Sequence, residues 1–167
     1  MVRKNQIILS SEAFDVIRRN CGVAYPYECC GALIGRDRLV IEALPLPNTT
    51  EEGAQTRFRV RPTDYQMAEQ RALRLNAELM GFYHSHPDHP ASPSQYDLDH
   101  AWPVFAYVIV SVDRGQPREV TSWRLTEDRS AFCEESVRVI TERDSGKKTK
   151  YYVNQDFDSD AIAHLCR

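Results

Sequence analysis

Two apolar runs separated by three charged residues constrain the fold of this chain more than any other feature of its sequence. Residues 30–35 and 39–44 flank the charged triplet Arg36, Asp37 and Arg38, a pattern typical of a β-hairpin. Both runs are too apolar to leave one face in water, so other elements must cover the hairpin on both faces. The sequence therefore predicts a layered α/β structure.

The rest of the chain shows the periodicities of further helices and strands. Apolar side chains at three- and four-residue steps predict two main helices, over residues 10–21 and 63–80, with Thr63 as the N-cap of the second. Apolar or alternating patterns predict strands over residues 6–9, 56–61, 81–85, 105–112 and 118–125. Residues 133–140 fit either a strand or a helix. We therefore expect a mixed β-sheet flanked by two main helices, with a short helix from about residue 94.

Length and composition predict one globular domain. The chain has 167 residues, of which 42% are hydrophobic and 27% charged, enough for a core of its own. The composition shifts after residue 140, which divides the chain into a domain at 1–140 and a C-terminal tail at 141–167, partly ordered or mobile.

Charge, hydropathy and cysteine usage exclude several classes of protein. The formal net charge of −3 argues against nucleic-acid binding. We find neither an apolar run long enough to span a bilayer nor a secretory signal. The five cysteines are odd in number and form no C-x-x-C pair, so we interpret them as reduced thiols of a cytoplasmic protein.

The strongest candidates for catalytic or metal-binding residues lie between positions 81 and 97. His84 and His86 are two apart on a predicted strand and therefore point to the same face. Asp97 follows a proline-rich loop that could return it to the two histidines, at the start of the next helix. Two imidazoles and one carboxylate leave the fourth tetrahedral position of Zn²⁺ to water, which is typical of catalytic zinc.

Each of these residues also has a structural interpretation. A His-x-His pair on a strand is more often a partly buried polar pair, and Ser94-x-x-Asp97 has the spacing of a capping box. Glu28 alone would be a surface carboxylate. His89 could be a fourth ligand, a substrate contact or part of the loop surface, and His100 could support a ligand or lie on the helix surface. The residues alone leave these alternatives open.

The complete pattern resembles the JAMM (MPN-plus) zinc metallopeptidases, in particular their compact prokaryotic type. The signature of that family is a glutamate upstream of His-x-His-Pro and Ser-x-x-Asp, with ten residues between the second histidine and the aspartate. The matching positions are Glu28, His84-Ser85-His86-Pro87 and Ser94-Gln95-Tyr96-Asp97. The resemblance extends over about residues 5–126 of the chain.

The resemblance implies an MPN-like (cytidine-deaminase-like) α/β fold, with residues 1–140 as the catalytic domain. It implies one catalytic Zn²⁺ on His84, His86 and Asp97, with Glu28 as the general acid/base and Ser94 as a hydrogen-bond donor to the oxyanion. The expected reaction is deubiquitinase-like hydrolysis of the peptide or isopeptide bond after the C-terminal Gly-Gly of a ubiquitin-like or sulfur-carrier protein. The alternatives are a non-catalytic MPN scaffold and a zinc amidohydrolase acting on small substrates.

Overall fold

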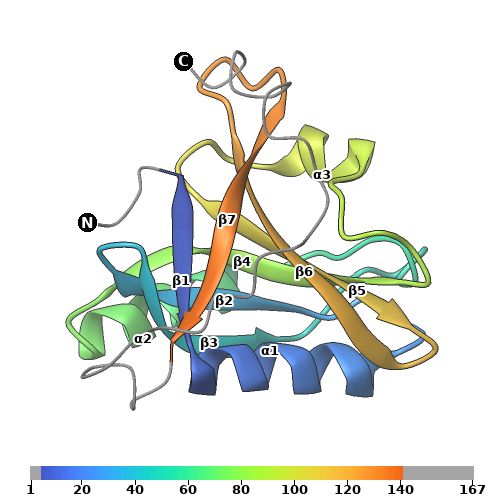
Figure 1. The fold of residues 1–167 in the computed structure, drawn as a ribbon, viewed down its shortest axis with the longest axis horizontal. Coiled ribbons are helices and arrows are strands. Elements are labelled where there is room, and N and C mark those ends of the chain that lie inside the picture. Colours follow the sequence, from blue (N-terminus) through green and yellow to red (C-terminus); the bar gives the residue numbers. More distant parts are fainter. Residues whose placement is uncertain (1–4, 141–167) are drawn as a thin grey trace.

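Seven strands close into a barrel in the computed structural model, which describes residues 5–140 (Figure 1). Their order around the barrel is β1-β3-β2-β4-β5-β6-β7. The strands are β1 (Gln6–Ser10), β2 (Cys30–Arg36), β3 (Leu39–Leu46), β4 (Glu78–Pro87), β5 (Ala106–Asp113), β6 (Gln116–Leu125) and β7 (Phe132–Ile140). The helices are α1 (Ser11–Ala24), α2 (Pro62–Arg74) and α3 (Gln95–His100). The expected tail at 141–167 lies outside the described residues, so this division of the chain stays a prediction.

The expectation of a mixed sheet flanked by two main helices is wrong. The strands form a closed barrel, and the helices are small, with 14, 13 and 6 residues. Closure depends on β7, which pairs parallel with β1 from Gln6 opposite Ser136 to Ser10 opposite Ile140. Local periodicity predicts strands one at a time and carries no information about which distant strands pair. The ambiguous segment 133–140 proves to be the strand that closes the barrel.

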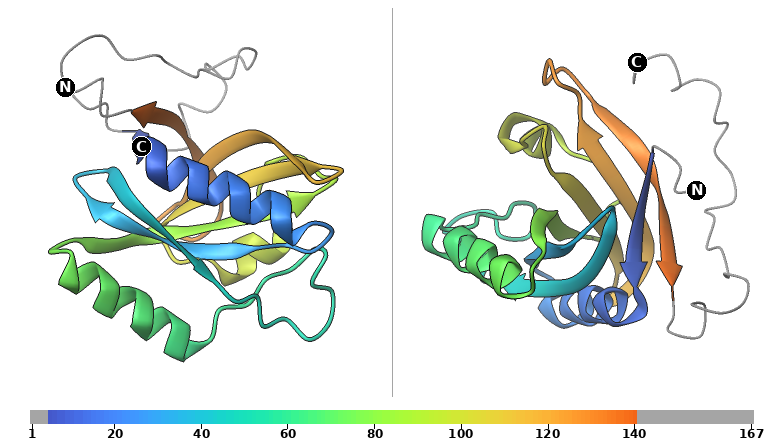
Figure 2. Two further views of the ribbon diagram at one scale, coloured as in Figure 1. Left: turned by 90° about the horizontal axis from the view of Figure 1, so that it is seen from below. Right: turned by 90° about the vertical axis from the view of Figure 1, so that its left-hand side faces the viewer.

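The central strand β4 separates two apolar clusters. One cluster joins Ile17 and Cys21 of α1 to Tyr83, and the other joins Ala68 of α2 to Phe82. Figure 2 shows α1 and α2 on opposite sides of β2 and β4. Because successive side chains of a strand point to opposite faces, the even-numbered residues of this part of β4 face α2 and α3. This alternation decides where the two histidines lie.

The second helix begins earlier and ends earlier than the sequence indicates. Its N-cap is Arg61, and Pro62 occupies the first helical position, which suits proline because its φ angle is already helical and no N–H is needed. Thr63 therefore lies inside the first turn and is not the N-cap. Beyond Arg74, Asn76 adopts a left-handed backbone with φ of 49°, and the chain turns into β4. The strand expected over 56–61 is irregular.

Among the described residues, no helix is long and apolar enough to cross a bilayer. Three cysteines, Cys21, Cys29 and Cys30, are buried free thiols.

Candidate metal centre

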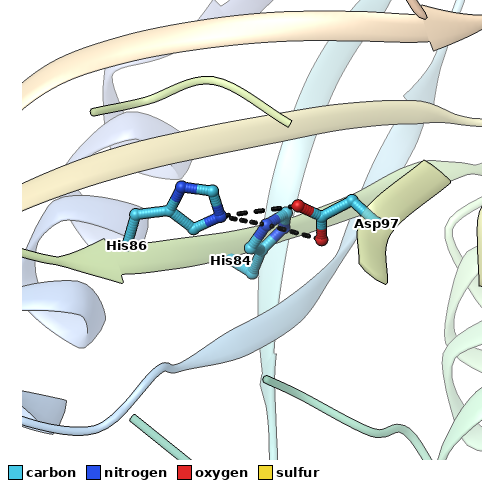
Figure 3. A group of neighbouring side chains, drawn as sticks. All are labelled: His84, His86 and Asp97. Atoms are coloured by element: carbon cyan, nitrogen blue, oxygen red, sulfur yellow. Dashed lines mark hydrogen bonds and ion pairs between the residues drawn. The ribbon is translucent and has the colours of Figure 1, made fainter. Parts of the chain in front are cut away.

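Strand β4 presents His84 and His86 side by side on the face that it turns to α3 (Figure 3). Both side chains are buried, with 0% and 7% of their surface exposed. The alternation of the strand sends the intervening Ser85 to the opposite face, where its hydroxyl accepts a hydrogen bond from the backbone N–H of Cys29. The two imidazoles therefore share one buried location.

The ligand atoms of three side chains converge at this location. His84 Nε2 and His86 Nε2 are 3.0 Å apart. Asp97 Oδ1 lies 3.2 Å from His84 Nε2, and Asp97 Oδ2 lies 3.6 Å from His86 Nε2. Zinc bonds of about 2.0–2.1 Å in a tetrahedron place two ligand atoms about 3.4 Å apart. The spacing and the chemistry of these donors thus fit a zinc ion.

The helix α3 brings Asp97 to the histidines. Ser94 is its N-cap, and the two residues form a complete capping box. Asp97 Oδ2 accepts hydrogen bonds from Ser94 N–H and Ser94 Oγ, each at 2.7 Å, and Ser94 Oγ accepts one from Asp97 N–H at 3.1 Å. The capping interpretation of Ser94-x-x-Asp97 is therefore correct, and it is compatible with the ligand interpretation because the same carboxylate also faces both imidazoles.

The two rings are held in different ways. His86 Nδ1 lies 2.8 Å from the carbonyl oxygen of Pro90; a carbonyl can only accept, so Nδ1 carries the proton and donates. In the neutral ring this leaves the lone pair on Nε2, as metal ligation requires. His84 Nδ1 is buried without a hydrogen-bond partner within the described part of the chain. Phe58 stacks on the His84 ring instead, with ring centroids 4.6 Å apart.

The two histidines keep the buried carboxyl of Asp97 negatively charged. Burial works to raise the pKa of Asp97, but hydrogen bonds and charges from His84 and His86 outweigh it and hold that pKa well below its usual range. Burial lowers the pKa of His84. For His86 burial also works to lower the pKa, but Asp97 and the Pro90 carbonyl raise it overall. A buried carboxylate beside two imidazoles is a suitable environment for a divalent cation.

Glu28 lies beside this cluster, although the chain separates them widely. It precedes β2 by two residues, and Cys30 of β2 pairs with His84 in the antiparallel register. Its side chain is buried, with 5% exposed. Burial raises the pKa of Glu28 to about 8, with His86 acting to lower it and Asp97 to raise it further. The pairing of two distant strands thus brings the expected acid/base residue within electrostatic reach of two expected ligands.

The two remaining histidines of this region stay outside the cluster. His89 is exposed in the loop after β4. His100 is exposed at the end of α3, where its Nδ1 lies 2.8 Å from the carbonyl oxygen of Tyr96 and its ring stacks on the Tyr96 ring. The alternatives that gave them surface positions agree with the structure. Among the described residues, His84, His86 and Asp97 form a group of three side chains that could hold a metal ion.

Sequence reasoning missed Asn48 and Phe58, which lie in the irregular segment 47–61. Asn48 bonds to the backbone of Glu28, and Phe58 stacks on His84. The segment shows no helical or strand periodicity that would mark either residue. A polar loop residue carries a recognisable signal only when its partners are local, and those of Asn48 include Glu28, 20 positions earlier in the chain.

Comparisons with known proteins find related sequences. Residues 10–126 match the family model described as prokaryotic homologs of the JAB domain. A desampylase from Haloferax volcanii is 30% identical over 116 residues, which make up 65% of this chain and 83% of the relative.

Solved structures show the same similarity. The solution structure of a protein from Salinibacter ruber has 38% sequence identity and a TM-score of 0.62, covering 78% of this chain and 90% of the other. A JAB1/MPN domain protein from Archaeoglobus fulgidus, at 19% identity and a TM-score of 0.51, shares the fold over 80% of this chain and 99% of its own. The MPN-like part of the expected fold is therefore consistent with the barrel.

Proposed function

Because the chain belongs to the family of prokaryotic homologues of the JAB domain, we propose that it is a zinc-dependent peptidase or isopeptidase. Its substrate in this proposal is a ubiquitin-like or sulfur-carrier protein in the cytoplasm, cleaved after the C-terminal Gly-Gly. The observation that carries the proposal is the convergence of His84, His86 and Asp97 within 4.8 Å of one another, with the buried carboxyl of Glu28 nearby. The similarity to a desampylase supports a hydrolase.

The three converging side chains would hold the zinc ion through His84 Nε2, His86 Nε2 and a carboxylate oxygen of Asp97. When bound, Zn²⁺ supplies a water molecule of lowered pKa and polarises the scissile carbonyl. His86 is already oriented for ligation by the hydrogen bond from Nδ1 to Pro90, and Asp97 by the hydrogen bonds from Ser94.

The chain's own residues then move the proton and stabilise charge. Glu28 takes a proton from the attacking water and returns it to the leaving amine, which is the work of a general acid/base. Its burial suits this role, because a pKa raised to about 8 lies close to neutral pH, so Glu28 can both accept the proton as a carboxylate and give it up again as an acid. The hydroxyl of Ser94 is the donor proposed for the developing oxyanion; before substrate binds, that hydroxyl donates to Asp97.

The strand pairing limits how a substrate tail can approach. β4 pairs with β2 from Glu78 to His84 and with β5 from Gly81 to Pro87, so an incoming tail cannot add to β4 as a further strand at His84. In this proposal it lies across the face that carries His84 and His86. Glycine residues suit such an approach, because the missing side chain lets the backbone come close to the metal ligands. Replacing the terminal glycines of the carrier by alanine is expected to slow cleavage.

A carrier with a C-terminal extension after Gly-Gly tests the proposal directly. We expect zinc-loaded wild-type protein to cleave after Gly-Gly, and Glu28→Gln to lose at least ~100-fold in kcat while still binding one zinc per chain. Retained activity in Glu28→Gln would refute the role of Glu28. Wild-type protein that binds zinc and leaves carriers intact would refute the proposed substrate, and turnover of short amides would then favour the amidohydrolase alternative.

A further inference from the structure

The backbone at Glu28 and Cys29 is hydrogen-bonded at all four of its polar groups. The Glu28 N–H donates to the carbonyl oxygen of Ala54 at 2.8 Å, and the Glu28 carbonyl accepts from Asn48 Nδ2 at 3.1 Å. The Cys29 N–H donates to Ser85 Oγ at 2.9 Å, and the Cys29 carbonyl accepts from the Ser85 N–H at 3.2 Å. These bonds leave the main chain that carries the Glu28 carboxyl little freedom to shift.

The side chain of Asn48 makes four hydrogen bonds, and one of these four reaches Glu28. Its Nδ2 donates to the carbonyl oxygens of Glu28, at 3.1 Å, and Arg57, at 2.9 Å. Its Oδ1 accepts from the N–H groups of Thr50 and Arg59, both at 3.1 Å. An amide side chain has two N–H donors and two acceptor lone pairs, so Asn48 uses its full capacity.

The same side chain controls what covers a proposed metal ligand. Its bonds to Arg57 and Arg59 hold the backbone on each side of Phe58. Phe58 stacks on the ring of His84 at a centroid distance of 4.6 Å and an interplanar angle of 26°. Asn48 therefore links the main chain of Glu28 to the aromatic ring that packs on His84.

We propose that Asn48 is a positioning residue of the hydrolytic site: it holds Glu28 in place relative to His84 by joining the segment 47–61 to the start of β2. The proposal rests on the function proposed above. Its physical basis is the steep dependence of a reaction on the placement of its acid/base group, for which a misplacement of about 1 Å can cost ~100-fold in rate.

Two variants of Asn48 and one control variant test this role. Asn48→Ala removes all four bonds. Asn48→Asp keeps an oxygen for the N–H groups of Thr50 and Arg59 but removes both donors, including the one that reaches Glu28. Thr49→Ala is the matched control, because the Thr49 hydroxyl donates to the Arg59 carbonyl in the same segment without touching Glu28.

The kinetic experiment measures kcat, KM and zinc content for the four proteins on the extended carrier. We expect kcat to fall ten- to a hundredfold in both Asn48 variants, with KM within about threefold of wild type and one zinc per chain. Thr49→Ala is expected to stay within about twofold of the wild-type kcat. Wild-type kcat in Asn48→Asp would overturn the proposal, as would a loss of activity that loss of zinc fully explains.

A second measurement needs neither zinc nor substrate. Amide hydrogen exchange in the metal-free protein reports whether the Glu28 N–H stays bonded to Ala54. We expect this amide to exchange at least ~10-fold faster in Asn48→Ala than in wild type or Thr49→Ala, while amides of β5 keep their protection. Unchanged exchange at Glu28 in Asn48→Ala overturns the proposal. If wild-type protein cleaves no carrier, the proposed function fails, and the exchange result still decides whether Asn48 holds Glu28.

Discussion

Ser94 and Asp97 hold each other through three hydrogen bonds at the start of α3, and the Asp97 carboxylate faces both imidazoles at the same time. One carboxylate oxygen accepts from the N–H and the hydroxyl of Ser94, while the hydroxyl oxygen accepts from the Asp97 N–H. The start of a short helix thus orients a side chain that also belongs to the candidate metal centre. A change at Ser94 must therefore act on Asp97 as well.

Removing the Ser94 hydroxyl is expected to weaken metal binding as well as catalysis. Ser94→Ala deletes one donor to Asp97 and the acceptor for its N–H, so we expect zinc affinity to fall about 10- to 100-fold in a chelator competition. At saturating zinc, kcat is expected to fall about 100-fold because the oxyanion donor is lost. Ser92→Ala, in the exposed part of the same loop, is the control. Unchanged zinc affinity in Ser94→Ala would show that Ser94 does not orient Asp97.

Removing a single ligand is expected to abolish stoichiometric zinc binding. We expect His84→Ala and Asp97→Ala to hold much less than one zinc per chain by elemental analysis. Zinc raises the melting temperature of a protein that binds it only in the folded state. It should therefore raise the melting temperature of wild type and leave the melting temperatures of both variants unchanged. His89→Ala, with its exposed side chain, should bind zinc like wild type. Full occupancy in the two ligand variants would mean that the ligands are wrongly assigned.

The buried carboxyl of Glu28 should make the metal-free protein less stable as the pH rises. The unfolded chain releases this proton near the ordinary pKa of 4.5, whereas the folded chain keeps it up to a pKa of about 8. The stabilising contribution is therefore complete below about pH 4.5 and is lost as the pH rises through about 8.

Glu28→Gln removes this titration. In the presence of a chelator, the variant should gain stability over wild type between pH 5 and pH 8.5, by roughly 3–5 kcal/mol in urea denaturation. Glu52→Gln, the same substitution at an exposed position, is the control. A pH-independent difference between wild type and Glu28→Gln would contradict the raised pKa of Glu28.

A methyl group at Gly31, in β2, should be poorly tolerated. A Cβ at Gly31 would lie 2.2 Å from Tyr83 Cε1, and Tyr83 is fully buried. Gly31→Ala is therefore expected to lower the free energy of unfolding by about 1–3 kcal/mol, as overpacking does. Gly22→Ala, where the nearest atom is 3.2 Å away and the helix favours alanine, should cost less. Equal effects would contradict the packing argument.

The histidines and the aspartate were predictable because their signals are local. Two-residue alternation on a strand places His84 and His86 on one face, and the capping-box spacing marks Asp97 as the start of a helix. The prediction of the family is confirmed by the match over residues 10–126. The catalytic roles of Glu28 and Ser94 stay predictions.

The remaining features depend on pairings between distant segments, which periodicity does not reveal. Glu28 reaches the cluster because β2 lies antiparallel to β4, and only the family resemblance indicated this in advance. The contacts of Asn48 depend on an irregular segment that folds back on the start of β2. The closure of the barrel depends on β1 meeting β7.

That last pairing has a consequence for biosynthesis. Gln6 and its partner Ser136 are 130 positions apart, so at 5–20 residues per second the ribosome makes the two strands about 7–26 s apart. During that interval β1 cannot form its ladder with β7, and its backbone groups on that side remain open to other chains. High contact order of this kind slows folding. Newly made copies should therefore depend on chaperones more than their modest size would suggest.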